Sequence, residues 1–139
     1  MRVLVTGGLG YIGAICAREL AGNHEVYKNK LELDIVKGDI LDASKLDKVL
    51  HSFKPDVVMH FAAYIQMGES VRDPRKYYEN NVAGSITLIE SMLSHNINKI
   101  VFASSAGVYG NPVHLPIKEA DPKEPTNPYG ETKLVVERL

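Results

Sequence analysis

A tyrosine and a lysine near the end of the chain, together with an earlier serine, have the types and spacing needed for proton-transfer chemistry. Tyr129 and Lys133 are four residues apart, so on a helix they share one face. A phenol is a poor base at neutral pH, but an adjacent ammonium stabilises its phenolate form. Ser105 follows a short apolar run and could hydrogen-bond the same substrate hydroxyl. The same Tyr-x-x-x-Lys spacing is ordinary on exposed helix surfaces, so its meaning depends on context.

A glycine-rich turn at residues 6–13 is the second candidate site. It fits G-x-G-x-x-G from Gly8 and G-x-x-G-x-x-G from Gly7 equally well. Glycines permit a tight turn and let the backbone approach a pyrophosphate, whose charge meets the N–H groups at a helix N-terminus. Glycines that only close a turn are the alternative, but the apolar run before and the amphipathic segment after favour a dinucleotide loop. The residues that we assign to the cofactor here are Gly7, Gly10, Tyr11, Ile12 and Gly13.

An acidic residue follows a third apolar run, in the sequence Gly38-Asp39-Ile40. At the end of a strand, Asp39 could accept a hydrogen bond from an adenine amino group while Ile40 packs on the ring. Asp39 could equally be the N-cap of the next helix. We therefore expect Asp39 and Ile40 among the cofactor-binding residues, with the capping role as the alternative.

Short apolar runs alternate with longer amphipathic segments, an order typical of a parallel sheet joined by crossover helices. We expect strands at residues 2–6, 25–27, 34–37, 57–61 and 99–103. Helices are expected at 11–21, 44–53 and 74–95 and from 129 onward, with a proline-rich surface loop at 110–128. The predicted fold is α/β: an NAD(P)-binding Rossmann fold, a doubly wound parallel sheet with helices on both faces, in one domain over residues 1–139.

Composition excludes several classes of partner. The chain carries 16 Lys and Arg against 17 Asp and Glu, a net charge of −1, and has no basic block, so we expect no nucleic acid or anionic membrane as a partner. No apolar stretch approaches the ~20 residues that span a bilayer. The N-terminus shows no targeting leader, and the lone Cys16 excludes an internal disulfide, so we expect a cytoplasmic protein. We assign no metal site.

The sequence also resembles a known family. Besides the glycine turn, the motifs that carry the resemblance are HFAA at 60–63, GESV at 68–71, YYENNVAG at 77–84, SSAGVYG at 104–110 and PYGETK at 128–133. The chain is similar to the extended branch of the short-chain dehydrogenase/reductases, and within it to the UDP-glucose 4-epimerases of the NAD-dependent epimerase/dehydratase family. This resemblance implies NAD as cofactor. It implies catalytic roles for Ser105, Tyr129 and Lys133, and cofactor contacts by Phe61, Ala62, Ala63, Asn81, Tyr129 and Lys133.

The implied reaction of the full-length protein is the interconversion of UDP-glucose and UDP-galactose. It proceeds by C4 oxidation, rotation of the 4-keto intermediate and re-reduction, with Tyr129 as the base. The implied partners are a UDP-hexose substrate and a second copy, with a homodimer formed through helix 74–95 and the helix that starts at Tyr129.

The alternatives are a 4-epimerase or decarboxylase for UDP-N-acetylhexosamine or UDP-glucuronate, and a non-catalytic dinucleotide-binding module. The resemblance does not extend to the sugar-nucleotide 4,6-dehydratases, which carry an Asp-Glu pair at this place to eliminate water. Here Ser105 is followed by Ala106-Gly107, without a carboxylate, so dehydration is disfavoured. Asn80 and Asn81 could instead be surface amides in mid-helix.

The sequence departs from the family in three places. The acid that binds the adenosine ribose is absent after residues 25–27, where Lys28-Asn29-Lys30 follow directly. We expect that a segment is missing after Tyr27, although the lysines could instead indicate a 2′-phosphate and NADP. Ile65 stands where the family often has a lysine. The uridine-binding region should follow Leu139, so we expect this stretch alone to be inactive.

Overall fold

In the part of the chain that the structure describes, three parallel strands form the centre of the fold. The structure is a computed structural model, and it describes residues 1–22 and 34–139. β1 (Val3–Thr6), β2 (Val57–His60) and β3 (Ile100–Phe102) pair in the order β1-β2-β3, with Val3 opposite Val57 and Val58 opposite Ile100. A doubly wound sheet places its first, fourth and fifth strands side by side in this order. The strands predicted at 2–6, 57–61 and 99–103 are therefore confirmed within a residue or two at their ends.

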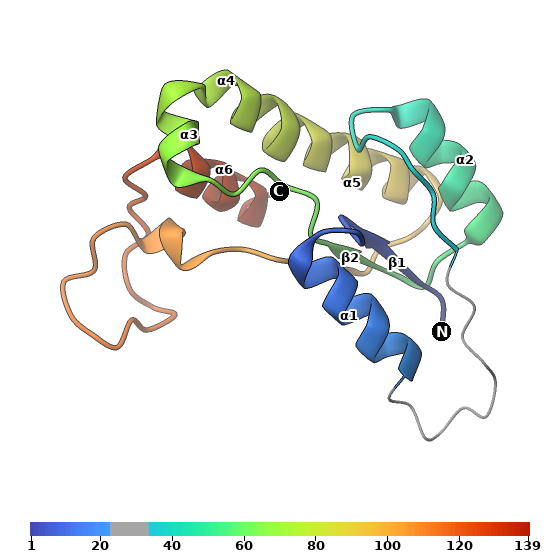
Figure 1. Cartoon of the computed structure of the whole chain (residues 1–139), viewed down its shortest axis with the longest axis horizontal. Helices are drawn as coiled ribbons and strands as arrows, with labels where there is room; N and C mark the ends of the chain where they lie inside the picture. Colours follow the sequence, from blue (N-terminus) through green and yellow to red (C-terminus); the bar gives the residue numbers. More distant parts are fainter. Residues whose placement is uncertain (23–33) are drawn as a thin grey trace.

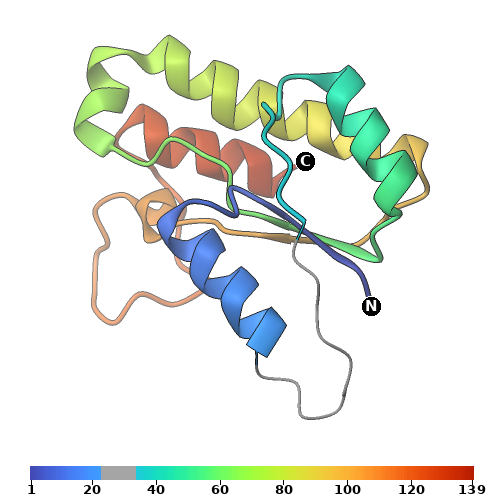
Figure 2. The ribbon, with the colours of Figure 1, turned by 45° about the vertical axis from the view of Figure 1, so that its right-hand side comes forward.

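Helices cover both faces of this sheet (Figures 1 and 2). α1 (Tyr11–Gly22) lies on one side, while α2 (Ala43–Phe53), α5 (Gly84–Ser94) and α6 (Pro128–Glu137) lie on the other. The two views agree on these layers. The predicted Rossmann-like α/β fold is confirmed, and the glycine turn lies between β1 and α1 at the carboxyl end of the strand.

The core lies between the sheet and the α2–α5 layer. α2 begins where Asp42 accepts a hydrogen bond from Lys45 N at 3.0 Å, and it ends at Lys54, which adopts a left-handed conformation with φ 48°. Its apolar face then turns inward. The buried residues that pack together here are Leu46, Leu50, Val58, Leu88, Met92 and Ile97. They fix α5 against β2, which in turn places the segment that precedes α5.

The strand predicted at 34–37 is wrong. Residues 34–38 carry no regular secondary structure, and Ile35 and Val36 are exposed. A strand needs a hydrogen-bonding partner, and within the described part of the chain this segment forms no ladder. The strand predicted at 25–27 and the segment expected to be missing after Tyr27 lie outside the described residues.

The continuous helix predicted at 74–95 is also corrected. It comprises α4 (Pro74–Tyr77), a π-helical segment η1 (Tyr78–Ala83) and α5. Several apolar residues at helical spacing in this segment are exposed to solvent, namely Tyr78, Ile86 and Leu93. The buried residues are Tyr77, Asn81, Gly84, Ser85, Leu88, Ser91 and Met92. The buried face therefore carries polar side chains, and π segments of this kind are frequent at functional sites.

Two short elements were not predicted. α3 (Met67–Arg72) follows the loop after β2, and a 3₁₀ turn η2 (Ala106–Tyr109) follows β3. Both are too short to show a helical period in the sequence. Within residues 1–22 and 34–139, no helix has the length and apolar character needed to cross a bilayer.

Candidate functional site

The glycine turn packs backbone to backbone against the end of β2. Gly7 has φ 68°, and a Cβ placed on it would lie 2.7 Å from the amide nitrogen of Ala62. Gly10 N donates to Gly7 O at 2.9 Å and leads the chain into α1. Only a chain without side chains at these points can bring the two backbones so close. Phe61 and Ala62, predicted to line the dinucleotide, are therefore brought to the turn.

The start of α1 is open to solvent on the same side. Tyr11 is 85% exposed and Ile12 is 56% exposed. The first N–H groups of a helix have no partner within it and point outward from its N-terminus. This open end of α1 offers N–H groups, and so a positive partial charge, to an anion such as a pyrophosphate.

Lys133 is buried beneath the end of β3. Its side chain is on α6 and is only 4% exposed, and Nζ donates to the carbonyl oxygen of Ala103 at 2.8 Å. Nζ also lies 4.7 Å from the ring centroid of Phe102 and 6.0 Å from that of Tyr129. Burial lowers the pKa of Lys133 to about 8. The predicted pair thus shares a buried face of α6, and the exposed-surface alternative is wrong for it.

Ser105 and Tyr129 meet around Gly107. The Ser105 hydroxyl accepts a hydrogen bond from Gly107 N at 3.1 Å and so caps η2. A Cβ on Gly107 would lie 3.3 Å from Ser105 Oγ and 3.9 Å from Tyr129 Cε1. The structure therefore brings Ser105, Tyr129 and Lys133 together at the carboxyl ends of the strands, the edge where open α/β sheets bind ligands.

The start of α6 is held by two side chains. Asn127 accepts from Gly130 N at 2.9 Å, and Pro128 occupies the first turn, where its missing N–H costs nothing. Tyr129 N donates to the hydroxyl of Ser70 at 3.1 Å, and Ser70 on α3 is fully buried. The position of Tyr129 thus depends on α3, a helix that the sequence did not predict.

Asn81 holds the loop after β2 in place by hydrogen bonds. It is 2% exposed, so the surface-amide alternative is wrong for it. Its Oδ1 accepts from Tyr64 N at 2.8 Å, and its Nδ2 donates to Tyr64 O at 3.0 Å and to Thr132 Oγ1 at 3.2 Å. One side chain thereby joins the loop after β2, at Tyr64, to α6, which carries Tyr129.

A second set of hydrogen bonds, from side chains of α3 and α4, holds the loop after β2. Glu69 accepts from Lys76 Nζ at 2.7 Å and from the hydroxyl of Tyr77 at 2.8 Å, and Gln66 N donates to that hydroxyl at 3.1 Å. Tyr77 is fully buried. Hydrogen bonds from Lys76 and Tyr77 outweigh desolvation and lower the pKa of Glu69. The carboxylate therefore stays charged and fixes the path of the chain next to Tyr64.

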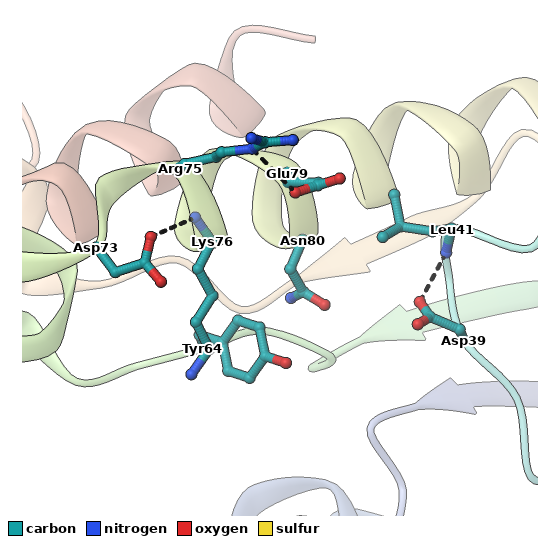
Figure 3. Close-up of a pocket in the computed structure, with 8 residues that line it drawn as sticks. All are labelled: Asp39, Leu41, Tyr64, Asp73, Arg75, Lys76, Glu79 and Asn80. Carbon is teal, nitrogen blue, oxygen red and sulfur yellow. Dashed lines mark hydrogen bonds and ion pairs between the residues drawn. The ribbon is translucent and has the colours of Figure 1, made fainter.

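Asp39, which the sequence predicts to contact the adenine, borders an open pocket of about 340 Å³ (Figure 3). Asp39 and Leu41 lie on one side of it, and Tyr64 and Lys76 lie on the other. Asp39 is not the helix cap, since Asp42 fills that position, and one Asp39 oxygen accepts from Leu41 N at 2.9 Å. Ile40 is buried, and its side chain lies where a Cβ on Gly84 would be. The pocket lining does not include Ser105, Tyr129 or Lys133.

Several residues that hold this site have no role that spacing in the sequence predicts. They lie in the motifs GESV, YYENNVAG and PYGETK and are Glu69, Ser70, Tyr77 and Thr132. Ser70 is 59 residues from Tyr129, and Asn81 is 51 residues from Thr132. These partners lie close together because β2 and β3 are parallel neighbours, so the segments that follow the two strands meet at the same edge of the sheet.

Comparison with known proteins gives consistent matches along the chain. The model of the NAD dependent epimerase/dehydratase family matches residues 3–139. UDP-glucose 4-epimerase of Halalkalibacterium halodurans is 45% identical over 150 residues, which cover 100% of this chain and 45% of that protein. UDP-glucose 4-epimerase of Brucella ovis in complex with NAD superposes with a TM-score of 0.90 at 40% identity, over 98% of this chain and 45% of that one. The Bifidobacterium longum enzyme with NAD⁺ and UDP gives 0.89 at 35% identity, over 99% of this chain and 47% of that one.

The chain spans about 45% of the length of the curated relatives that it matches. The alignment with the H. halodurans protein runs over 150 residues against 139 in this chain, so that relative has residues within the matched stretch that this chain lacks. A segment missing after Tyr27 would produce such a difference.

Proposed function

Because the chain belongs to the NAD dependent epimerase/dehydratase family, we propose that it forms part of an enzyme that interconverts UDP-glucose and UDP-galactose. One observation carries the proposal: Tyr129 and the buried Lys133 lie with Ser105 at the carboxyl ends of the strands, on the same sheet as the glycine turn. A module that only bound a dinucleotide would need the turn but not these three side chains.

The cofactor is proposed to be NAD, held by one domain over residues 1–139. Two observations support this: Gly7 lets the turn pack against the end of β2, and the N-terminus of α1 that follows is open to solvent, where its N–H groups can meet a pyrophosphate. When bound, NAD supplies a hydride acceptor and donor for C4 of the sugar. The residues proposed to hold it are Gly7, Gly10, Tyr11, Ile12, Gly13, Asp39, Ile40, Phe61, Ala62, Ala63, Asn81, Tyr129 and Lys133.

The three polar side chains divide the proton chemistry between them. The Tyr129 hydroxyl, as phenolate, takes the proton of the sugar 4-hydroxyl and later returns it. Lys133, whose pKa of about 8 keeps it mostly protonated at neutral pH, stabilises that phenolate from within the same helix. The hydroxyl of Ser105 holds the sugar oxygen beside Tyr129. The 4-keto sugar then rotates in the site, and re-reduction from the opposite face inverts C4.

We further propose that the enzyme is a cytoplasmic homodimer in galactose metabolism. Exposed apolar side chains on the outer face of η1 and α5, at Tyr78, Ile86 and Leu93, support a second copy packed on these helices. The single cysteine, Cys16, needs no oxidising compartment.

The test is conversion of UDP-galactose by the full-length protein, followed by NMR. We expect UDP-glucose to appear with no net consumption of NAD. We expect the Tyr129→Phe variant to lose this activity while it still binds NAD. Full activity in Tyr129→Phe would refute the assigned base, and the absence of conversion by the wild type would refute the substrate.

A further inference from the structure

A chain of buried hydrogen bonds runs beneath the glycine turn and uses a histidine that the proposed chemistry does not need. His60, at the end of β2, is 1% exposed. Its Nδ1 lies 2.6 Å from Thr6 Oγ1, and its Nε2 lies 2.9 Å from Ser85 Oγ. Ser85 donates to the carbonyl oxygen of Asn81 at 2.5 Å, and Ala62 N donates to Thr6 Oγ1 at 3.4 Å.

The donor and acceptor roles along this hydrogen-bond network determine which nitrogen of the His60 ring carries a proton. A carbonyl oxygen only accepts, so the single hydroxyl proton of Ser85 points to Asn81 O. Ser85 Oγ must then accept from His60, so Nε2 carries a proton. In the neutral ring Nδ1 is an acceptor, and the Thr6 hydroxyl donates to it. Every member then has a partner, which a buried polar network requires.

The two ends of this hydrogen-bond network reach the two segments proposed to bind the cofactor, the glycine turn and the segment that carries Asn81. Thr6 directly precedes Gly7, and it also holds the amide of Ala62. At the other end, the backbone of Asn81 is held by Ser85, and its side chain holds Tyr64. His60 lies between β1 and the π segment and is the link that joins them.

We propose that His60 is a positioning residue, held neutral as the Nε2–H tautomer, which keeps the glycine turn and the Asn81 segment in register and so sets the seat of the dinucleotide. The identity of that ligand rests on the proposed function. The tautomer does not, because it follows from the hydrogen bonds and from the burial of the ring.

The surroundings oppose a charge on this ring. Burial and, to a smaller extent, the charge of Lys133 on α6 lower the pKa of His60 to about 4. The ring of Phe102 from β3 lies 5.7 Å away and offers no counter-charge. An imidazolium would also turn Nδ1 into a donor toward Thr6 and leave the Thr6 hydroxyl proton without its acceptor.

The first test is the tautomer itself, read from the ring ¹⁵N shifts of the full-length protein labelled with [¹⁵N]histidine. The His60 signals are assigned by their loss in His60→Gln. We expect one protonated and one bare nitrogen in the Nε2–H pattern, unchanged from pH 5.5 to 9. An Nδ1–H pattern, or titration within that range, would overturn the proposal.

The second test is NAD affinity, measured by calorimetry on three variants. His60→Gln keeps a donor for Ser85 but loses the acceptor for Thr6, and Ser85→Ala breaks the other link. We expect each to weaken binding about tenfold, as for the loss of about one hydrogen bond. Thr87→Ala is the matched control, since Thr87 on the same helix makes the same bond to a carbonyl four residues back, Ala83 O at 2.9 Å, without a histidine.

The outcomes separate the two proposals. If Ser85→Ala and His60→Gln bind NAD as tightly as Thr87→Ala does, the positioning role is wrong even if the enzyme epimerises its substrate. If the wild type binds no NAD, the proposed function is wrong, and the ¹⁵N pattern still decides the state of His60.

Discussion

Gly7→Ala should damage both the fold and the cofactor seat, and the structure gives the size of the effect. Gly7 has φ 68°, a conformation that costs an L-residue about 1–2 kcal/mol. The new Cβ would also lie 2.7 Å from Ala62 N and 2.8 Å from the carbonyl carbon of Phe61, which are backbone atoms that cannot rotate away. Overpacking of this kind costs about 1–3 kcal/mol.

Together these terms predict that the free energy of unfolding falls by about 2–5 kcal/mol. Urea unfolding at 25 °C measures this loss, and calorimetry measures the parallel loss of NAD affinity. Gly68→Ala is the control, because a Cβ on Gly68 meets nothing within 4 Å and the residue lies in α3. Since alanine is the better helix former by up to about 1 kcal/mol, this variant should be neutral or more stable. Equal stability of the two variants would refute the close approach of the turn to β2.

Three further changes test the rest of the site. Ser70→Ala removes the acceptor of Tyr129 N, so kcat should fall about tenfold, whereas Ser52→Ala, which loses only a bond to Val49 O, should leave kcat unchanged. Tyr77→Phe removes the hydroxyl that joins Glu69 to Gln66 N and should destabilise the protein by about 1–3 kcal/mol in urea unfolding. Lys133 has a pKa of about 8 in the fold against its ordinary 10.5, so the unfolded chain binds more protons between these values. The free energy of unfolding should therefore rise with pH from 8 to 10.5 by up to about 3 kcal/mol relative to Lys133→Met, and equal pH slopes would contradict this.

Local signals in the sequence predicted much of the fold. The run of Val57, Val58 and Met59 after Pro55 predicted β2, and the glycine turn predicted the start of α1 at Tyr11. These features work because strands, turns and helix ends depend mainly on nearby residues.

The failures occurred where structure depends on distant partners. Ile35 and Val36 have strand composition, but a strand exists only when another strand pairs with it. In the helical segment 74–94, Tyr77 and Asn81 are buried while Tyr78 is exposed. The buried face is held by hydrogen bonds of polar side chains with distant partners, which a pattern of apolar residues does not reveal.

The candidate site was predictable as a set of residues but not as a network. Ser105, Tyr129 and Lys133 were selected by type and order, and the structure places them together. Their supports, such as Ser70 beneath Tyr129, come from segments more than 50 residues away. Their roles emerge only from the packing of α3, η1 and α6.

The most direct test of the central claim is the fate of the C4 hydrogen. The full-length enzyme is given UDP-galactose that carries deuterium at C4 of the sugar, in ordinary water. Because the proposed reaction removes hydride from C4 and returns it within the same site, the UDP-glucose formed should keep its deuterium at C4, as read by NMR. Loss of the label to solvent would contradict the proposed epimerisation.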